Sequence, residues 1–264
     1  VLIKLLASAA FEHFRNRDSL GPDQFLISHT YSSFGRPVAN SIWDNASAVL
    51  VGDFLLARAS SIAAATGRLE IFNIMSSVME DMAQGELHQL TRKGDSALSE
   101  EEYLRIIRNK TAVLMSGACQ AGAILAGAPE SREKALADYG LSLGMAFQMT
   151  DDLLDYTAAT DQLGKTAGAD LQEGKYTLPL IYALSRAEEQ DRQMMTDIMA
   201  DQDFNRESLA GFNRLLEKYG GFDYTEQCAA EYVARAKQAL AVFPPSEERS
   251  LLMKLADYAR QRNN

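Results

Sequence analysis

The stretch Ala146-Phe147-Gln148-Met149-Thr150-Asp151-Asp152-Leu153-Leu154-Asp155 combines a helical pattern of apolar residues with three aspartates. It lies within residues 131–156, where apolar side chains recur at the three- and four-residue spacing of an α-helix. In such a helix Asp151 and Asp155 lie one turn apart on one face, with Asp152 beside them. Like charges at this spacing destabilise a helix, so the stretch indicates both a helix and a place for a cation.

Helical spacing continues on both sides of this stretch. In residues 98–127, Ser99 and Glu102 have the spacing of a capping box, and Gly127 with Pro129 ends the helical pattern. Further helical stretches cover residues 46–65, 69–90, 177–187 and 224–242. No segment alternates as a strand does, and no Gly-rich linker or repeat divides the chain. We therefore predict an all-α fold class and one domain over residues 1–264.

The overall charge excludes one large class of function. The chain has 264 residues, of which 47% are hydrophobic, and its formal net charge is -10. This composition suits a folded globular protein and excludes a disordered chain or a small disulfide-stapled fold. The negative charge argues against generic nucleic-acid binding. An anionic substrate would need local lysines, arginines or a bound metal to reverse the charge inside one cleft.

The cysteines and the longest uncharged stretch bear on location. Cys119 and Cys228 have no partner at metal-ligand spacing, so we interpret them as reduced thiols and expect a cytoplasmic protein. Residues 111–129 carry no charge, but they contain Ser116, Gln120 and three glycines. We expect a buried core helix there and no membrane span.

The aspartates and the lysines after them suggest a metal and an anion. Three carboxylates without His or Cys suit Mg²⁺, which commonly bridges protein carboxylates and substrate phosphates. A solvated acidic turn is the alternative, and the motif alone leaves it open. Lys165 and Lys175 follow at ten-residue intervals and could fold back over a metal-bound diphosphate. Lys110, at the edge of the uncharged stretch, either reaches solvent or lies beside an anion at the mouth of an apolar cavity.

Several motifs together resemble the trans-prenyltransferases, the head-to-tail polyprenyl diphosphate synthases. The aspartate-rich stretch with the residues after it resembles the second aspartate-rich region of that family. The other matching motifs, in the family's order, are Gly35-Arg36-Pro37, Val51-Gly52-Asp53, Gln84-Gly85-Glu86, Lys110-Thr111, Leu163-Gly164-Lys165 and Glu173-Gly174-Lys175. The resemblance implies an isoprenoid-synthase-type helical bundle around a central cavity.

The resemblance also implies a reaction and a role for each motif. An allylic diphosphate and isopentenyl diphosphate would condense repeatedly, with loss of pyrophosphate, to give an all-trans polyprenyl diphosphate. The metal ligands for Mg²⁺ would be Asp151, Asp152 and Asp155. The catalytic residues would be Lys110, Lys165 and Asp151. The substrate-binding residues would be His29, Lys110, Thr111, Gln148, Lys165 and Lys175.

Residues 35–58 resemble the long-chain bacterial enzymes of the octaprenyl or heptaprenyl kind, and the family's usual state is a homodimer. A terpene cyclase, which shares the all-α fold, ranks below the synthase. Cyclases usually lack the Asp-Leu-x-Glu-Gly-Lys sequence at residues 170–175.

One departure from the family pattern stands between Thr30 and Gly35. The family has an earlier D-D-x-x-D here, whereas this sequence passes from Thr30 to Gly35 through four residues without an aspartate. Either the protein lacks the first motif and is a non-catalytic partner subunit of a heteromeric prenyltransferase, or the sequence omits a loop that the protein has. We favour the second explanation, because deleting a loop between packed helices would be hard to accommodate.

Overall fold

The structure, a computed structural model, describes residues 45–157, 168–200 and 206–261. Within these ranges every regular element is a helix, which confirms the predicted all-α fold. The long helices are α3 (Asn45–Ala65), α4 (Leu69–Thr91), α6 (Val113–Leu125), α7 (Glu130–Thr157), α12 (Gly221–Ala239) and α13 (Glu247–Arg260). The shorter elements are α5 (Glu100–Ile107), η1 (Arg108–Ala112), α8 (Ala169–Gln172), α9 (Leu178–Arg186), α10 (Glu189–Ala200), α11 (Arg206–Lys218) and η2 (Leu240–Val242).

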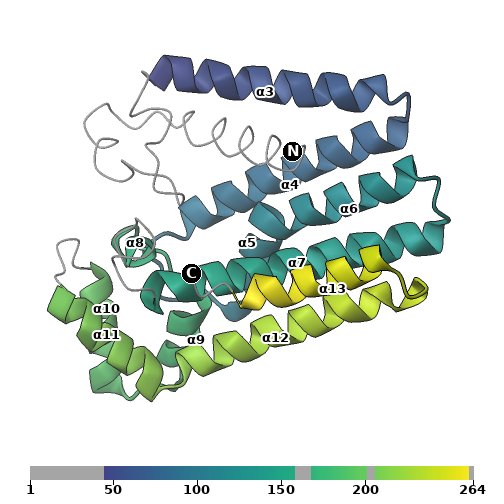
Figure 1. The fold of residues 1–264 in the computed structure, drawn as a ribbon. Helices are drawn as coiled ribbons and strands as arrows, with labels where there is room; N and C mark the ends of the chain where they lie inside the picture. The colour runs from purple at the N-terminus through teal and green to yellow at the C-terminus, as the bar shows by residue number, and fades with distance from the viewer. Residues whose placement is uncertain (1–44, 158–167, 201–205, 262–264) are drawn as a thin grey trace.

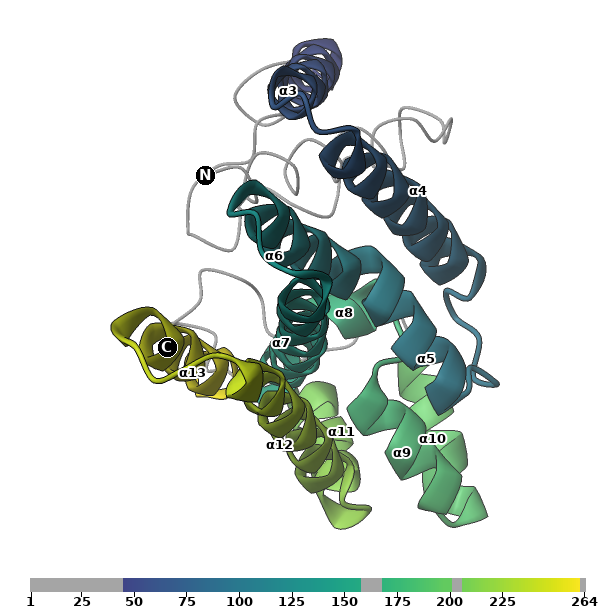
Figure 2. The same ribbon diagram turned by 90° about the vertical axis from the view of Figure 1, so that its right-hand side faces the viewer.

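Helix α7 occupies the centre of the molecule. It packs most extensively against α6 and α12, and α13 packs against both α7 and α12 (Figure 1). On the other side α4 packs against α6 and η1, and α3 lies outermost against α4 (Figure 2). The short helices α9, α10 and α11 gather at one end of the bundle, close to the C-terminal end of α7. The last turns of α7, which bear the three aspartates, therefore lie where several elements meet.

The largest hydrophobic cluster surrounds those last turns. Met149 of α7, Leu178 and Leu180 of α9, Phe212 of α11 and Tyr103 of α5 are buried there. A second cluster joins α7, α12 and α13, and a small third one joins α3, α4 and α6. Because the largest cluster draws on helices from both halves of the chain, the site end of α7 is held from several sides.

The helix predicted over residues 98–127 differs from the one observed. Its capping box is confirmed: the Ser99 hydroxyl accepts a hydrogen bond from the Glu102 amide, and the Glu102 carboxylate accepts one from the Ser99 amide. However, the helix is interrupted by η1, a single turn of π-helix in which the Val113 amide donates to the Arg108 carbonyl. Such a wide turn is frequent at functional sites, and this one carries Lys110 and Thr111.

Two glycines of α7 allow α6 and η1 to approach its backbone. A Cβ atom at Gly144 would lie 2.5 Å from the Cα of Ala112, and one at Gly140 would lie 2.4 Å from the carbonyl oxygen of Met115. Neither contact leaves room for a side chain. Close approach, rather than an unusual backbone conformation, therefore requires glycine at these positions.

No helix in the described ranges combines the length and apolar character needed to cross a bilayer. The prediction of one domain over residues 1–264 and the prediction of a central cavity both stay predictions.

Replacing Gly144 with alanine should destabilise the fold, because the new methyl group would push α7 away from Ala112. Overpacking of this kind costs about 1–3 kcal/mol in the free energy of unfolding. Urea denaturation followed by circular dichroism would measure it. The matched control is Gly122→Ala in α6, where a Cβ meets no atom within 4 Å. Alanine there should raise the stability by about 0.5–1 kcal/mol. Equal effects of the two substitutions would contradict this account.

Candidate active site

The three aspartates of α7 lie in three different environments. Asp151 is exposed, Asp155 is half-buried and Asp152 is buried. The helical spacing predicts that Asp151 and Asp155 share a face, whereas Asp152 is rotated toward α5 and its carboxylate enters the protein interior. The motif therefore divides into two outer carboxylates and one inner carboxylate.

The inner carboxylate, Asp152, accepts two hydrogen bonds from protein side chains. The Tyr103 hydroxyl donates to Oδ2 at 2.6 Å, and the Gln148 Nε2 donates to Oδ1 at 2.7 Å. Burial, followed by the nearby charge of Asp170, raises the pKa of Asp152 well above its ordinary value, while the two hydrogen bonds act in the opposite direction. This environment differs from the solvated one expected for a Mg²⁺ ligand.

The half-buried carboxylate, Asp155, anchors the segment around α8. Its Oδ2 accepts a hydrogen bond from the Asp170 amide at 2.9 Å, and its carbonyl oxygen accepts one from the Gly168 amide at 2.9 Å. Gly168 has a φ of +83°, a conformation that favours glycine, and it lets the chain turn directly into α8. As a result, Asp170 is brought beside the aspartates of α7.

The ammonium of Lys175 lies between two carboxylates of its own segment. Nζ is 2.8 Å from Asp170 Oδ1 and 2.7 Å from Glu173 Oε2. Burial lowers the pKa of Lys175, but the two carboxylates more than compensate and raise it above its ordinary value. Lys175 is thus a charged group that offsets Asp170 and Glu173, a role that the substrate-binding prediction did not include.

The π turn presents Lys110 to α4 and Thr111 to α7. Lys110 Nζ donates to Gln89 Oε1 at 2.7 Å and lies 3.1 Å from Glu86 Oε2. The approach is possible because residue 85 is glycine: a Cβ there would lie 2.6 Å from the Lys110 amide nitrogen. The Thr111 hydroxyl donates to Gln148 Oε1 at 2.8 Å.

These contacts bring together most of the predicted site residues that the structure describes. Hydrogen bonds link Thr111, Gln148 and Asp152, with Lys110 adjacent in the chain and Asp151 and Asp155 on the same helix as Gln148. Lys175 joins them through Asp170 and Asp155. His29, Lys165 and the Thr30–Gly35 junction lie outside the described residues.

A comparison with known families identifies the chain. The model of the polyprenyl synthetase family matches residues 35–215. The chain belongs to this family. An octaprenyl diphosphate synthase from Haemophilus influenzae is 38% identical over 258 residues, which cover 98% of this chain and 78% of the relative. The octaprenyl diphosphate synthase from Escherichia coli is 41% identical over 229 residues, which cover 87% of this chain and 71% of the relative.

A solved structure supports the same conclusion for the fold of this polyprenyl synthetase. A polyprenyl synthase from Caulobacter crescentus, complexed with calcium and isoprenyl diphosphate, has a TM-score of 0.86 and is 36% identical. The match covers 100% of this chain and 77% of that chain. The predicted isoprenoid-synthase-type helical bundle and the family resemblance are thereby confirmed.

Asp151 and Asp155 are the residues of this synthetase best suited to hold a metal. Their oxygen ligands fit a hard cation. In the part of the chain that the structure describes, no group of three or more His, Cys, Asp or Glu side chains is arranged to hold an ion. A cation here would therefore take its remaining ligands from water and from phosphate oxygens, as Mg²⁺ commonly does.

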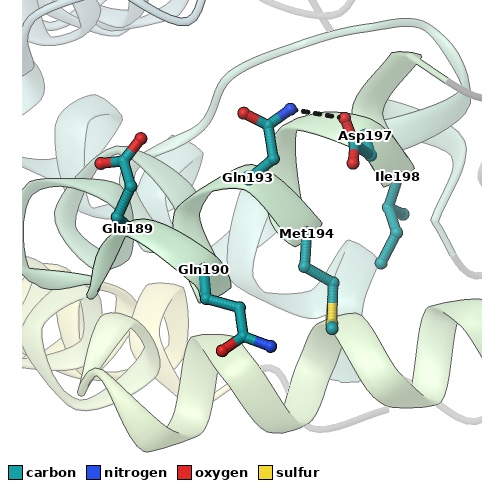
Figure 3. A pocket seen from close by; sticks show the side chains of 6 residues that line it. All are labelled: Glu189, Gln190, Gln193, Met194, Asp197 and Ile198. Atoms are coloured by element: carbon teal, nitrogen blue, oxygen red, sulfur yellow. Dashed lines mark hydrogen bonds between the residues drawn. The ribbon is translucent and has the colours of Figure 1, made fainter.

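A surface hollow of about 800 Å³ lies on α10. Its described lining comes from that single helix and includes Gln190, Met194 and Ile198 (Figure 3). Gln193 of its rim donates a hydrogen bond to Asp197 one turn later. Since none of the predicted site residues lines the hollow, the α7 region remains the candidate active site.

The site includes residues that were not predicted to belong to it. In the sequence Tyr103 fits only the pattern of an apolar helical position. Its hydroxyl contacts Asp152 only because α5 packs on α7. Asp170, Glu173 and Glu86 belong to motifs that resemble the family, and this is the local signal that associates them with a site. Their partners depend on the tertiary structure.

Replacing Lys175 with methionine should lower the stability of the synthetase. The side chain is only 25% exposed, and its loss would leave Asp170 and Glu173 without their cation. We expect a loss of roughly 1–3 kcal/mol in the free energy of unfolding, the cost of leaving half-buried acceptors without their donor. Thermal and urea denaturation would measure it.

Lys218→Met is the matched control for Lys175→Met, because Lys218 forms a close ion pair with Asp191 but is 55% exposed. An exposed pair contributes little, so this substitution should have a much smaller effect. If Lys175→Met were no more destabilising than Lys218→Met, the Lys175 cluster would not have the structural role assigned to it.

Proposed function

We propose that this polyprenyl synthetase joins isopentenyl diphosphate to an allylic diphosphate, head to tail and repeatedly, and releases pyrophosphate. The product would be an all-trans polyprenyl diphosphate. The observation that carries the proposal is the linked set at the end of α7: outer carboxylates at Asp151 and Asp155, and the pair of Gln148 with Thr111 beside Lys110. The names of the relatives, which are octaprenyl diphosphate synthases, support the same reaction.

Asp151 and Asp155 would hold Mg²⁺, whereas Asp152, the third ligand predicted from the sequence, would support them from inside the bundle, because Tyr103 and Gln148 donate to both of its oxygens. When bound, the ion would act as a Lewis acid that neutralises the leaving diphosphate. The Caulobacter crescentus relative, solved with calcium and isoprenyl diphosphate, supports a divalent cation and a diphosphate in this kind of fold.

Lys110 would provide positive charge from the protein itself. Glu86 and Gln89 hold its ammonium at a fixed place on the π turn. A diphosphate oxygen could replace one of these partners, since Lys110 is only half-buried. Lys165, His29 and Lys175 keep their predicted substrate-binding roles as part of the proposal.

Thr111 and Gln148 would lie beside the allylic carbon. Ionisation of the carbon–oxygen bond leaves a cation, and oriented dipoles can stabilise it without reacting with it. The Thr111 hydroxyl donates a hydrogen bond to the Gln148 carbonyl oxygen. The two oxygens, which are the negative ends of their dipoles, therefore lie 2.8 Å apart. Both residues are half-buried, which lets a ligand reach them from one side.

Turnover by the purified chain with Mg²⁺, isopentenyl diphosphate and an allylic diphosphate would test the proposed function. We expect pyrophosphate release and chain-extended products in the wild type. Asp151→Ala should abolish turnover by removing a metal ligand, while the helical fold, measured by circular dichroism, survives. Raising the Mg²⁺ concentration should restore little of the activity.

Asp197→Ala is the control for Asp151→Ala, because Asp197 is an exposed aspartate of α10, a helix that bears none of the predicted site residues. Its activity should equal that of the wild type. Unchanged turnover of Asp151→Ala at both limiting and saturating Mg²⁺ would contradict the metal role of Asp151. A wild-type chain that turns over only after a second subunit is added would instead favour the alternative of a non-catalytic partner subunit, which the comparisons do not support.

We also propose that the protein is a homodimer. Leu50 and Phe54, one turn apart on α3, are both 66% exposed, and Val51 beside them is 47% exposed. Helix α3 is the outermost helix of the described bundle and packs mainly on α4 (Figure 1). A second copy of the chain is the occupant best suited to such an apolar face, given the homodimer usual in this family.

Replacing Leu50 with glutamate should weaken the dimer, because a charge would then enter its apolar interface. Light scattering after size-exclusion chromatography should give twice the 29.0 kDa chain mass for the wild type and a shift toward the single-chain mass for the variant. Leu251→Glu on α13 is the control, since Leu251 is 67% exposed on a different face. An equal mass for all three proteins would contradict the placement of the interface on α3.

We further propose a cytoplasmic location. Cys119 and Cys228 are free thiols in the structure, which suits a reducing compartment.

A further inference from the structure

A chain of three side-chain hydrogen bonds runs through the site from α5 to η1. The Tyr103 hydroxyl donates to Asp152, Gln148 Nε2 donates to the other oxygen of Asp152, and the Thr111 hydroxyl donates to Gln148 Oε1. The three bonds measure 2.6, 2.7 and 2.8 Å. They join residues that are 49, 4 and 37 positions apart in the sequence, so the complete series of hydrogen bonds forms only when the helices pack together.

This series of hydrogen bonds begins at buried residues and ends at residues that are partly exposed to solvent. Tyr103 is 3% exposed and Asp152 is 5% exposed, whereas Gln148 and Thr111 are half-buried. Buried polar groups cost free energy unless they have hydrogen-bond partners, so Tyr103 and Asp152 are strongly held in this arrangement. Thr111 and Gln148, at the open end, are the residues proposed to lie beside the allylic carbon.

The direction of each hydrogen bond sets the orientation of the Gln148 amide. In the structure Asp152 accepts the hydrogen bond from the nitrogen end of the amide, as an ionised carboxylate must. The oxygen end must then point toward Thr111, as observed. Without Asp152 in this position, either end of the amide could face the reacting carbon.

Tyr103 keeps Asp152 in that position. Its hydroxyl is the donor to Oδ2, and its ring belongs to the largest hydrophobic cluster, which fixes the hydroxyl relative to α7. The two oxygens of Asp152 therefore both face protein donors, which suits a supporting role inside the bundle better than a place among the metal ligands.

We propose that Tyr103 is a positioning residue for the condensation: through Asp152 it holds the Gln148 amide with its carbonyl oxygen turned toward Thr111 and the reacting carbon. This proposal rests on the proposed function. Asp152 transmits the position of Tyr103 to Gln148, while Asp151 and Asp155 would hold the cation.

The test uses Tyr103→Phe, which removes one hydroxyl and keeps the ring. Tyr139→Phe is the matched control: Tyr139 is buried, and its hydroxyl donates to the Leu252 carbonyl in a different cluster. Asp152→Asn serves as a second variant, because its amide can no longer accept from both Tyr103 and Gln148. Circular dichroism establishes that each variant is folded.

The first measurement is the NMR signal of the Gln148 side-chain amide, identified by its absence in Gln148→Leu. In the wild type its protons should exchange slowly with solvent. In Tyr103→Phe and Asp152→Asn the signal should shift and exchange should accelerate, while Tyr139→Phe leaves it unchanged. This readout needs neither substrate nor metal.

The second measurement is kinetic. A misplaced catalytic group commonly lowers the rate by up to about 100-fold, so kcat of Tyr103→Phe should fall by between about 10- and 100-fold. KM for the allylic diphosphate should change little, because the lost interaction acts on the reacting carbon and not on the diphosphate. Tyr139→Phe should keep the wild-type kcat.

Two results would overturn the proposal: an unaltered Gln148 amide signal in both variants, or an altered signal with wild-type kcat. If the wild type makes no product, the proposed function fails. The amide signal then decides separately whether Tyr103 fixes Gln148.

Discussion

The contact between α7 and the helix pair α6 and η1 is the constraint on which the site depends. Glycines at 140 and 144 let the backbone of α6 and the π turn reach the backbone of α7. With any larger residue, Thr111 would move away from Gln148, and the hydrogen-bond chain to Asp152 would be broken. The requirement at Gly85 is the same, because it brings α4 against the opposite side of the π turn. The site is thus built by close backbone approach as much as by its polar groups.

Negative charge accumulates at one end of the bundle and is partly balanced there. Asp151, Asp152, Asp155 and Asp170 come together there, and the pKa of Asp152 rises as a result of its burial and of the charge of Asp170. Lys175 offsets part of this charge from within the protein. The negative charge that remains would be neutralised by a divalent cation, which Asp151 and Asp155 are proposed to hold. An overall acidic protein can in this way handle a diphosphate.

Much of the fold and part of the site could be predicted from the sequence. The all-α class was predicted from helical periodicity, the capping box at Ser99 and the absence of strand patterns. The family was predicted from the motifs around Asp151, Lys110 and Glu173. The π turn could not be predicted, because residues 98–127 have the periodicity of a continuous helix. The wide turn is recognised only by its backbone hydrogen bonds and by its packing on Gly85 and Gly144.

The residue types of the site could be predicted from the sequence alone, because the motifs of α7, η1 and the segment 170–175 are local. The environment and the hydrogen-bond partners of each of these residues depend on the tertiary structure. Adjacent aspartates point in different directions from a helix, so Asp152 meets Tyr103 inside the bundle while Asp151 faces solvent. Lys175 meets Asp170 and Glu173 because of the fold of its own segment. Partners 49 and 37 positions apart are set by helix packing, and no local pattern of residues encodes that packing.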